Sequence, residues 1–256
     1  MLLGTGLSAQ VAENRSATYL FPSEVQDARA IWITPAGLAM RQEASVYLDL
    51  TVTDPGSLGQ LRQLNAGFNA RGLGFAYQRD QFSGGTRAAT YKLAFATGEG
   101  SMAVGFGTTW YRGNTKGTGF DLGVTYKALG PLAAAVGIAT LGQPSVRGLV
   151  QRVRYTGSAS LQVAPGFGVG ALAAANPSGF QAFAADLRAQ FDPGFPLGVI
   201  LRLDTDQKFR RTQFAVGISI GGLSQVGVTT TTPGDVSSLN AVTLYGVSAQ
   251  IPSARH

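Results

Sequence analysis

The stretch Thr118–Lys127, TGFDLGVTYK, alternates between two kinds of side chain at every step. Large apolar side chains occupy every second position, namely Phe120, Leu122, Val124 and Tyr126. Small or charged side chains occupy the positions between, namely Asp121, Gly123, Thr125 and Lys127. Successive side chains of a β-strand point to opposite faces, so this stretch predicts a strand with one apolar face and one small or polar face. Much of the chain repeats the pattern, in segments of about the length that crosses a bilayer when a strand is tilted.

The composition of the chain fits a membrane barrel better than a soluble domain. Charged residues make up 13% of the 256 residues, whereas about a quarter is usual for soluble proteins. The sequence has no apolar run of about 18 residues, which a membrane-spanning helix would need. Low charge without a helical span therefore predicts a membrane β-barrel. Cysteine is absent, which excludes disulfides and thiolate metal sites, and we expect neither a metal nor another cofactor.

Turn residues separate about fourteen alternating segments, and bacterial barrels have an even number of antiparallel strands. The expected strands are Val46–Val52, Leu64–Phe68, Leu73–Tyr77, Tyr91–Phe95, Met102–Trp110, Thr118–Lys127, Leu132–Leu141, Arg152–Val163, Phe167–Asn176, Gln181–Phe191, Leu197–Asp204, Thr212–Ile220, Ser224–Thr230 and Leu239–Ala249. Alternate connections differ in length, as they do at the two rims of a barrel; the turn Asn69–Gly72 is short and the polar loop Asp80–Thr86 is longer. The predicted fold is therefore all-β, an antiparallel transmembrane β-barrel of about 14 strands over residues 44–250, with a tail at 251–256.

The residues before this barrel lack the alternation and are expected to form two units. Residues 1–10, MLLGTGLSAQ, combine a short apolar piece with small residues, which favours a signal-peptide remnant over an ordinary N-terminus. Residues 11–43 predict an irregular segment with a short helix over Ser23–Trp32, capped by Ser23 with Gln26 three residues later. Irregular backbone cannot face lipid, because its amides would lack partners. We therefore expect residues 11–43 to form a plug-like segment inside or beneath the barrel.

The end of this segment, IWITPAGLA at Ile31–Ala39, resembles a motif of known outer-membrane barrels. The pattern W-x-N-P-A-G-L-A before the first strand is typical of the FadL/PorV-like superfamily, which includes long-chain fatty-acid transporters and the PorV-type proteins of a bacterial secretion system. Thr34 stands where the family has Asn, which removes a side-chain hydrogen bond. The resemblance implies a barrel of about 14 strands with its N-terminal segment in the lumen; a Pro-Ala-Gly turn in another β protein is the alternative. The expected plug residues are Trp32, Pro35, Gly37 and Leu38.

The alternation also predicts which polar side chains face the interior. Arg or Lys facing lipid at mid-depth costs about 2–4 kcal/mol, so charged residues on strands should point inward or lie at the rims. The expected lumen-facing residues are Asp49, Gln63, Asn65, Gln78, Lys92, Asp121, Lys127, Arg152, Arg154, Asp186, Arg188 and Arg202. Their charges would neutralise one another, for instance Asp186 with Arg188 or Arg202, or would favour anions or amphiphiles in the lumen.

Three stretches match catalytic or cofactor motifs but lack the structural context that the chemistry needs. Gly98–Ala103 and Gly166–Ala171 fit loose dinucleotide fingerprints, which require a helix that opens at the glycines. Gly217–Gly221 fits G-x-S-x-G, which requires a strand-to-helix turn and a histidine base. Strand-like alternation surrounds all three stretches, and the sole histidine is His256 at the last position. We therefore predict that the protein is not an enzyme.

The expected protein is a bacterial outer-membrane barrel that takes up or binds small hydrophobic or amphiphilic molecules passively. Its expected partners are outer-membrane lipids and a hydrophobic small molecule. A PorV-like secretion or assembly scaffold, which binds a secretion-system or periplasmic protein, is the first alternative, and a soluble β-rich binding protein is the second. The net charge of +6 does not indicate nucleic-acid binding, because Lys and Arg are scattered singly rather than arranged in a basic stripe.

Overall fold

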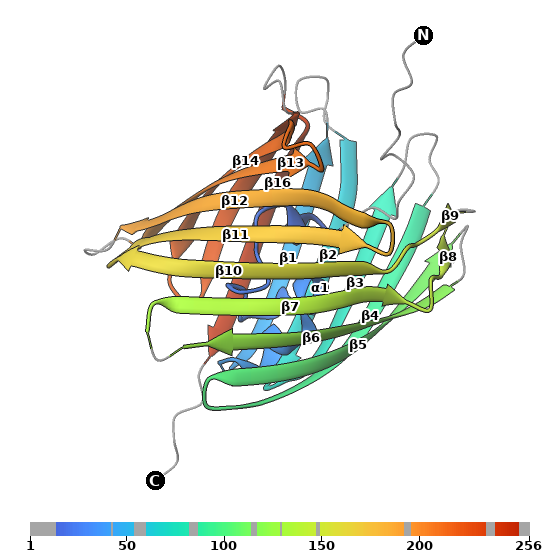
Figure 1. The fold of residues 1–256 in the computed structure, drawn as a ribbon, viewed down its shortest axis with the longest axis horizontal. Coiled ribbons are helices and arrows are strands. Elements are labelled where there is room, and N and C mark those ends of the chain that lie inside the picture. The colour runs from blue at the N-terminus through green and yellow to red at the C-terminus, as the bar shows by residue number, and fades with distance from the viewer. Residues whose placement is uncertain are drawn as a thin grey trace.

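The computed structural model describes residues 14–41, 43–53, 60–81, 87–113, 117–128, 130–146, 149–191, 196–233 and 239–250. Within these residues, fourteen antiparallel strands close into a barrel (Figure 1). Strand β1 (Ala44–Thr53) pairs with β16 (Ala241–Gln250), which joins the two ends of the sheet. The predicted antiparallel barrel of about 14 strands is confirmed. The expected signal remnant at 1–10 and tail at 251–256 lie outside the described residues.

The other strands follow one another around the wall in chain order, and each pairs with the next. They are β2 Gln60–Ala70, β3 Leu73–Gln81, β4 Arg87–Glu99, β5 Met102–Gly113, β6 Gly117–Lys127, β7 Leu132–Leu141, β10 Arg154–Ala164, β11 Phe167–Asn176, β12 Gly179–Phe191, β13 Leu197–Asp206, β14 Arg211–Gly221 and β15 Gln225–Pro233. A small separate hairpin, β8 (Ser145–Val146) with β9 (Leu149–Val150), follows β7.

The two faces of each strand meet different surroundings, as the alternation predicts. In β6, the side chains of Phe120, Leu122 and Tyr126 are exposed on the outer surface, whereas Gly123 and Thr125 are buried. The outer face of the barrel is therefore apolar and the inner face small or polar. A lipid-facing wall needs this arrangement, because apolar side chains must cover the outside of a membrane barrel.

Two glycines make the turns at one rim possible. Gly72, between β2 and β3, has a φ of 101°, and its carbonyl accepts a hydrogen bond of 2.7 Å from the Ala96 amide. Gly166, between β10 and β11, has a φ of 73°, and its carbonyl accepts a 2.6 Å bond from the Gln190 amide. A side chain at either position would be strained at this φ and would meet a carbonyl oxygen of the neighbouring strand. Both glycines therefore fix a turn against the strand beside it.

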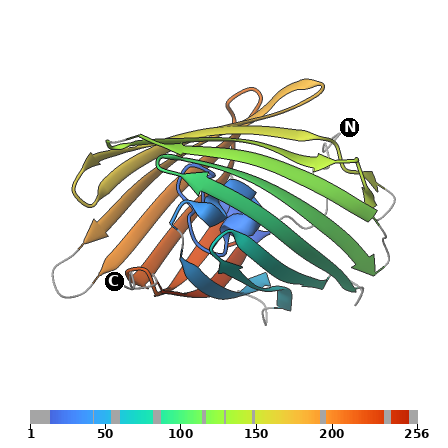
Figure 2. The ribbon, with the colours of Figure 1, turned by 90° about the horizontal axis from the view of Figure 1, so that it is seen from below.

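The N-terminal segment, residues 14–41, lies inside the barrel (Figure 2). It contains the 3₁₀-helix η1 (Arg15–Thr18), the one-turn helix α1 (Ala30–Ile33) and the 3₁₀-helix η2 (Pro35–Ala39). Its apolar side chains form the main core cluster with the inner wall; Tyr19, Ile31 and Leu38 are fully buried there. None of the helices in the described part of the chain is long and apolar enough to cross a membrane.

The predicted helix over Ser23–Trp32 is wrong for most of its length, since only α1 is helical within it. The barrel wall provides the reason. The Ser23 amide donates a 2.9 Å hydrogen bond to the Ser158 hydroxyl, and the Ala28 amide donates a 2.9 Å bond to the Ser45 hydroxyl. The wall thus takes the Ala28 amide, which a helix over Ser23–Trp32 would bond to the Glu24 carbonyl, and Ser23 caps no helix.

Candidate functional site in the barrel interior

The N-terminal segment crosses the lumen and is bonded to opposite sides of the wall. At its start, the Asn14 side chain donates a 3.0 Å hydrogen bond to Gln78 on β3. Farther along, the Ser23 amide reaches Ser158 on β10, and the Ala28 amide returns to Ser45 on β1. Strands β1 and β10 are seven places apart in the ring of fourteen. The segment therefore spans the cross-section instead of lining one side.

The residues predicted as the plug meet the wall at a row of glycines. Pro35, Gly37 and Leu38 are buried, and Trp32 is half-buried. A Cβ added at Gly105 of β5 would overlap the backbone of Pro35 and Ala36. Because glycine lets another backbone approach closely, the wall and the segment touch here without side chains between them.

Gly123 and Thr34 extend this close contact to the next strand. A Cβ added at Gly123 of β6 would overlap the Thr34 hydroxyl. That hydroxyl is buried and has no hydrogen-bond partner in the described part of the chain. Thr34 is the position at which the resembled motif has Asn.

A buried arginine anchors the middle of the segment. Arg29 forms a 2.7 Å ion pair with Asp27, and its guanidinium lies 4.9 Å from the ring centre of Tyr245 on β16. Tyr245 in turn stacks on Tyr19 at 5.4 Å between centroids. Burial alone would raise the pKa of Asp27, but the charge and hydrogen bonds of Arg29 outweigh it and lower the pKa. The pair is therefore ionised, and the aromatic rings shield it.

A second charged group ties the segment to β12. Glu24 forms a 2.8 Å ion pair with Arg188, whose Nε lies 3.5 Å from Asp186. Burial raises the pKa of Glu24, Arg188 partly opposes the rise and Asp186 adds to it, which together give a pKa of about 8. Two carboxyl groups thus compete for one guanidinium, and a proton on Glu24 relieves their repulsion.

Arg202 of β13 holds the backbone of the same segment. Its Nη1 donates hydrogen bonds to the carbonyls of Ala17 at 2.8 Å and Leu20 at 3.3 Å. Its Nη2 pairs with Asp204 at 2.7 Å, and the guanidinium lies 4.7 Å from the ring centre of Phe21. Ala17 lies in the last turn of η1 and Leu20 follows that helix, and a charged donor from the wall satisfies both carbonyls.

The inner faces of β1, β2 and β3 carry a polar network. The Asn65 side chain donates to Asp49 and, at 2.9 Å, to Gln63. Gln63 donates to Asp80 at 2.9 Å, and Gln78 donates to the same carboxylate. The prediction that Asp80 begins the loop after this strand is wrong, because β3 extends to Gln81 and Asp80 is buried.

Most of the predicted lumen-facing residues are in the interior. The buried ones are Asp49, Gln63, Asn65, Gln78, Lys92, Asp121, Asp186 and Arg202, and Arg188 is half-buried. Lys92 and Asp121 form a 2.5 Å ion pair, and Asp186 lies beside Arg188. The predicted neutralisation between interior charges is therefore present in the structure.

Three of the expected lumen-facing residues lie at or next to strand ends, which fits the expectation that charged residues point inward or lie at the rims. Lys127 is the last residue of β6, Arg154 is the first residue of β10, and Arg152 precedes it; all three are exposed. Their side chains reach water at a rim, where a long cationic side chain can keep its charge hydrated. The alternation alone could not distinguish the middle of the lumen from its edge.

The alternation in the sequence did not predict which charged residues of the N-terminal segment take part in the interior contacts. Glu24, Asp27 and Arg29 stand in a stretch without periodicity, so no pattern predicted where they point. Asn69 was read as part of a turn; its side chain also donates a 3.0 Å hydrogen bond to the Leu38 carbonyl. Among the described residues, no group of three or more His, Cys, Asp and Glu side chains is arranged to hold a metal ion.

The motif-like glycine stretches are part of the wall. Gly217–Gly221 forms the end of β14, and Ser219 lies within that strand. Gly98 of β4 faces Ala103 of β5 across a hairpin. Neither stretch opens a helix, which a nucleophile elbow or a dinucleotide site would require.

Comparisons with known proteins bear on the fold. No family model matches the sequence, and no curated protein matches it. The toluene transporter TbuX of Ralstonia pickettii has a similar structure, with a TM-score of 0.56 and 11% sequence identity over 86% of this chain and 92% of that one. A mutant of the Rhodopseudomonas blastica porin gives a TM-score of 0.45 with 8% identity, over 81% of this chain and 99% of that one. The KdgM porin gives 0.41 with 8% identity, over 79% and 97%.

At such low identity, the similarity to TbuX concerns the fold alone. The closed ring of fourteen strands, the apolar outer face and the polar inner face agree with that fold. Together these features define a membrane β-barrel of the outer-membrane type.

Proposed function

We propose that this chain is an outer-membrane barrel for the passive uptake or binding of small hydrophobic or amphiphilic molecules. In this proposal, residues 14–41 act as a plug that decides what passes. The observation that carries it is the path of the segment across the lumen, with bonds to β3, β10 and β1. An open water-filled pore would not need a segment that is bonded across its section.

The chemistry of the interior supports the amphiphilic class of molecule. Tyr19, Tyr47 and Tyr245 are buried beside the polar network of β1 to β3, and the Trp32 indole donates to the Tyr47 hydroxyl. Such aromatic side chains offer an apolar body and a polar end, which suits a molecule with both kinds of surface. TbuX, which has the same fold, is described as a toluene transporter.

A scaffold barrel of the PorV type is the second candidate function. The observation that favours it is the attachment of the segment to the wall, through the Glu24–Arg188 pair and the contact of Arg29 with the Tyr245 ring. A barrel whose segment never moves would be closed to solutes and would act by binding partner proteins at its rims.

A conductance measurement distinguishes the two. Deletion of Ser16–Met40 is expected to leave a folded barrel, because every strand keeps both neighbours, and to raise its conductance in planar bilayers several-fold. The full-length protein and a variant with the exposed substitution Gln207→Ala serve as references. An unchanged conductance in a folded deletion variant would contradict the plug and favour the scaffold.

A further inference from the structure

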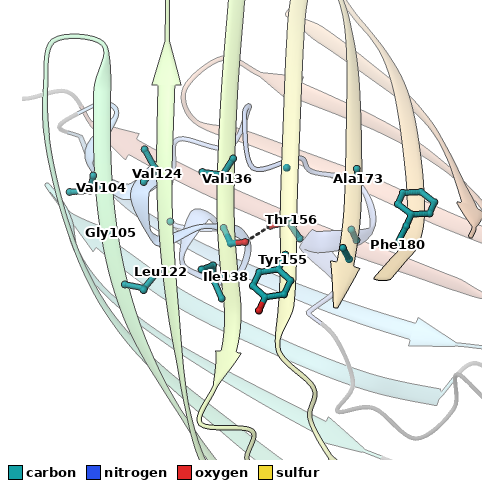
Figure 3. A pocket seen from close by; sticks show the side chains of 15 residues that line it. Val104, Gly105, Leu122, Val124, Val136, Ile138, Tyr155, Thr156, Ala173 and Phe180 are labelled. Atoms are coloured by element: carbon teal, nitrogen blue, oxygen red, sulfur yellow. Dashed lines mark hydrogen bonds between the residues drawn. The ribbon is translucent and has the colours of Figure 1, made fainter. Parts of the chain in front are cut away.

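The outer wall has a hollow of about 710 Å³ across strands β5, β6, β7, β10 and β11, with Phe180 of β12 at its side (Figure 3). Its side-chain lining is apolar and includes Val104, Leu122, Val136, Tyr155, Ala173 and Phe180. Most of these side chains are exposed on the outer surface; Val136, for example, is 59% exposed. The volume lies within the range of about 300–1,000 Å³ that is typical of small-molecule sites.

Small residues that face one another across the strands form the floor of the hollow. Gly105 pairs with Gly123, and Gly123 pairs with Gly137. Gly157 faces Val136 on one side and Ala173 on the other. A Cβ added at Gly157 would meet no atom within 4 Å, so this glycine leaves open space above the wall. The neighbouring strands project larger side chains and form the sides.

The N-terminal segment supports this floor from the inside. Pro35 and Ala36 touch the wall at Gly105, and Thr34 touches it at Gly123. The segment therefore holds these glycines in place from the inside, and the floor of the hollow is fixed before anything binds there. A preformed site binds with a smaller cost of ordering than one that must be shaped by its ligand.

The chemistry of the lining selects the occupant. No charged residue lines the hollow, and the Thr156 hydroxyl is directed to the Gly137 carbonyl at 3.5 Å. The hollow is continuous with the exposed apolar band of β5, β6 and β7, which faces lipid in a membrane barrel. We propose that the hollow binds one acyl chain of a membrane lipid. This assignment is independent of what passes through the lumen.

Photo-cross-linking tests the proposal with the full chain in phosphatidylethanolamine vesicles that carry a diazirine-labelled palmitoyl chain. We expect the label to concentrate on peptides of β6, β7, β10 and β11. Gly157→Trp fills the hollow from its floor and should reduce that labelling by about fivefold or more. Gly246→Trp is the matched control, because Gly246 also faces outward, where an added Cβ would meet only the Val226 side chain at 3.8 Å, but lies on β16, away from the hollow.

Several outcomes would overturn the proposal. Labelling spread evenly around the barrel would do so, as would equal labelling of Gly157→Trp and the wild type. Cross-links between two copies at these strands would instead assign the hollow to a second chain. If Gly157→Trp does not fold, Ala173→Phe fills the same hollow from an exposed outward position and must give the same loss of labelling.

Discussion

Outward-facing residues at different places along one strand are expected to lie at different depths in the membrane. Leu122 and Tyr126 both point outward on β6, with 43% and 49% of their surface exposed. Leu122 lies at the centre of the strand and Tyr126 lies next to its end. The two positions thus share a strand and a face and differ in depth.

We predict that Leu122→Arg lowers the free energy of unfolding by about 2–4 kcal/mol, because its charge would lie near mid-bilayer, whereas Tyr126→Arg costs about 1 kcal/mol or less from its charge. Reversible urea unfolding in phosphatidylcholine vesicles measures both. Similar losses for the two variants would mean that β6 is not placed across the bilayer as the exposure of its residues indicates.

At this scale, the sequence predicted the direction of side chains well and their depth poorly. The alternation placed Leu122 outside and Asp121 inside, because the pleat of a strand leaves no other choice. It did not distinguish the buried interior residues from Lys127 and Arg154, which lie at strand ends and are exposed. Depth depends on where a strand ends. Asp80 shows the reverse case, because it was expected in a loop but lies within β3 and is buried.

At the scale of elements, the N-terminal segment is the part whose structure depends on the rest of the chain. Its motif at Trp32–Ala39 could be recognised, and its place in the interior follows from the needs of irregular backbone. Its helices could not be predicted, because contacts with the wall, such as those of the Ser23 and Ala28 amides with Ser158 and Ser45, determine the path of its backbone. Such contacts join residues up to 135 positions apart, and no local pattern encodes them.

The attachment of this element should weaken as the pH rises. Glu24 has a pKa of about 8 in the folded protein against an ordinary value of 4.5, so the folded state binds its proton more tightly. The contribution of this proton to the free energy of unfolding is fully present below about pH 4.5 and is lost as the pH rises through 8. The free energy falls by at most about 1.4 kcal/mol per pH unit over this range. The charged groups that face Glu24 are Asp186 and Arg188 of β12 and Arg202 of β13.

Hydrogen exchange of peptides from residues 20–28 measures this effect, after correction for the intrinsic dependence of exchange on pH. We expect protection to fall between pH 5 and 9 in the wild type and to stay nearly constant in Glu24→Gln, which cannot ionise. The same fall in both proteins would show that another group controls the attachment of the segment.

At the scale of the whole molecule, closure and surface chemistry decide where the protein can reside. All fourteen strands have partners on both sides, so the described sheet has no free edge. Large apolar side chains such as Val46, Phe95 and Leu244 are more than half exposed on the outside. A soluble protein rarely exposes a continuous apolar surface of this kind, so water alone is a poor solvent for this barrel.

We therefore predict that the protein fractionates with outer membranes and needs detergent to stay monodisperse. Its closed hydrogen-bonded wall should also resist dodecyl sulfate at room temperature, because no strand can be removed without breaking two ladders. The unheated protein should then migrate ahead of the boiled protein on a gel. Size-exclusion chromatography with and without detergent completes the measurement, and a single sharp peak in plain buffer would contradict the membrane assignment.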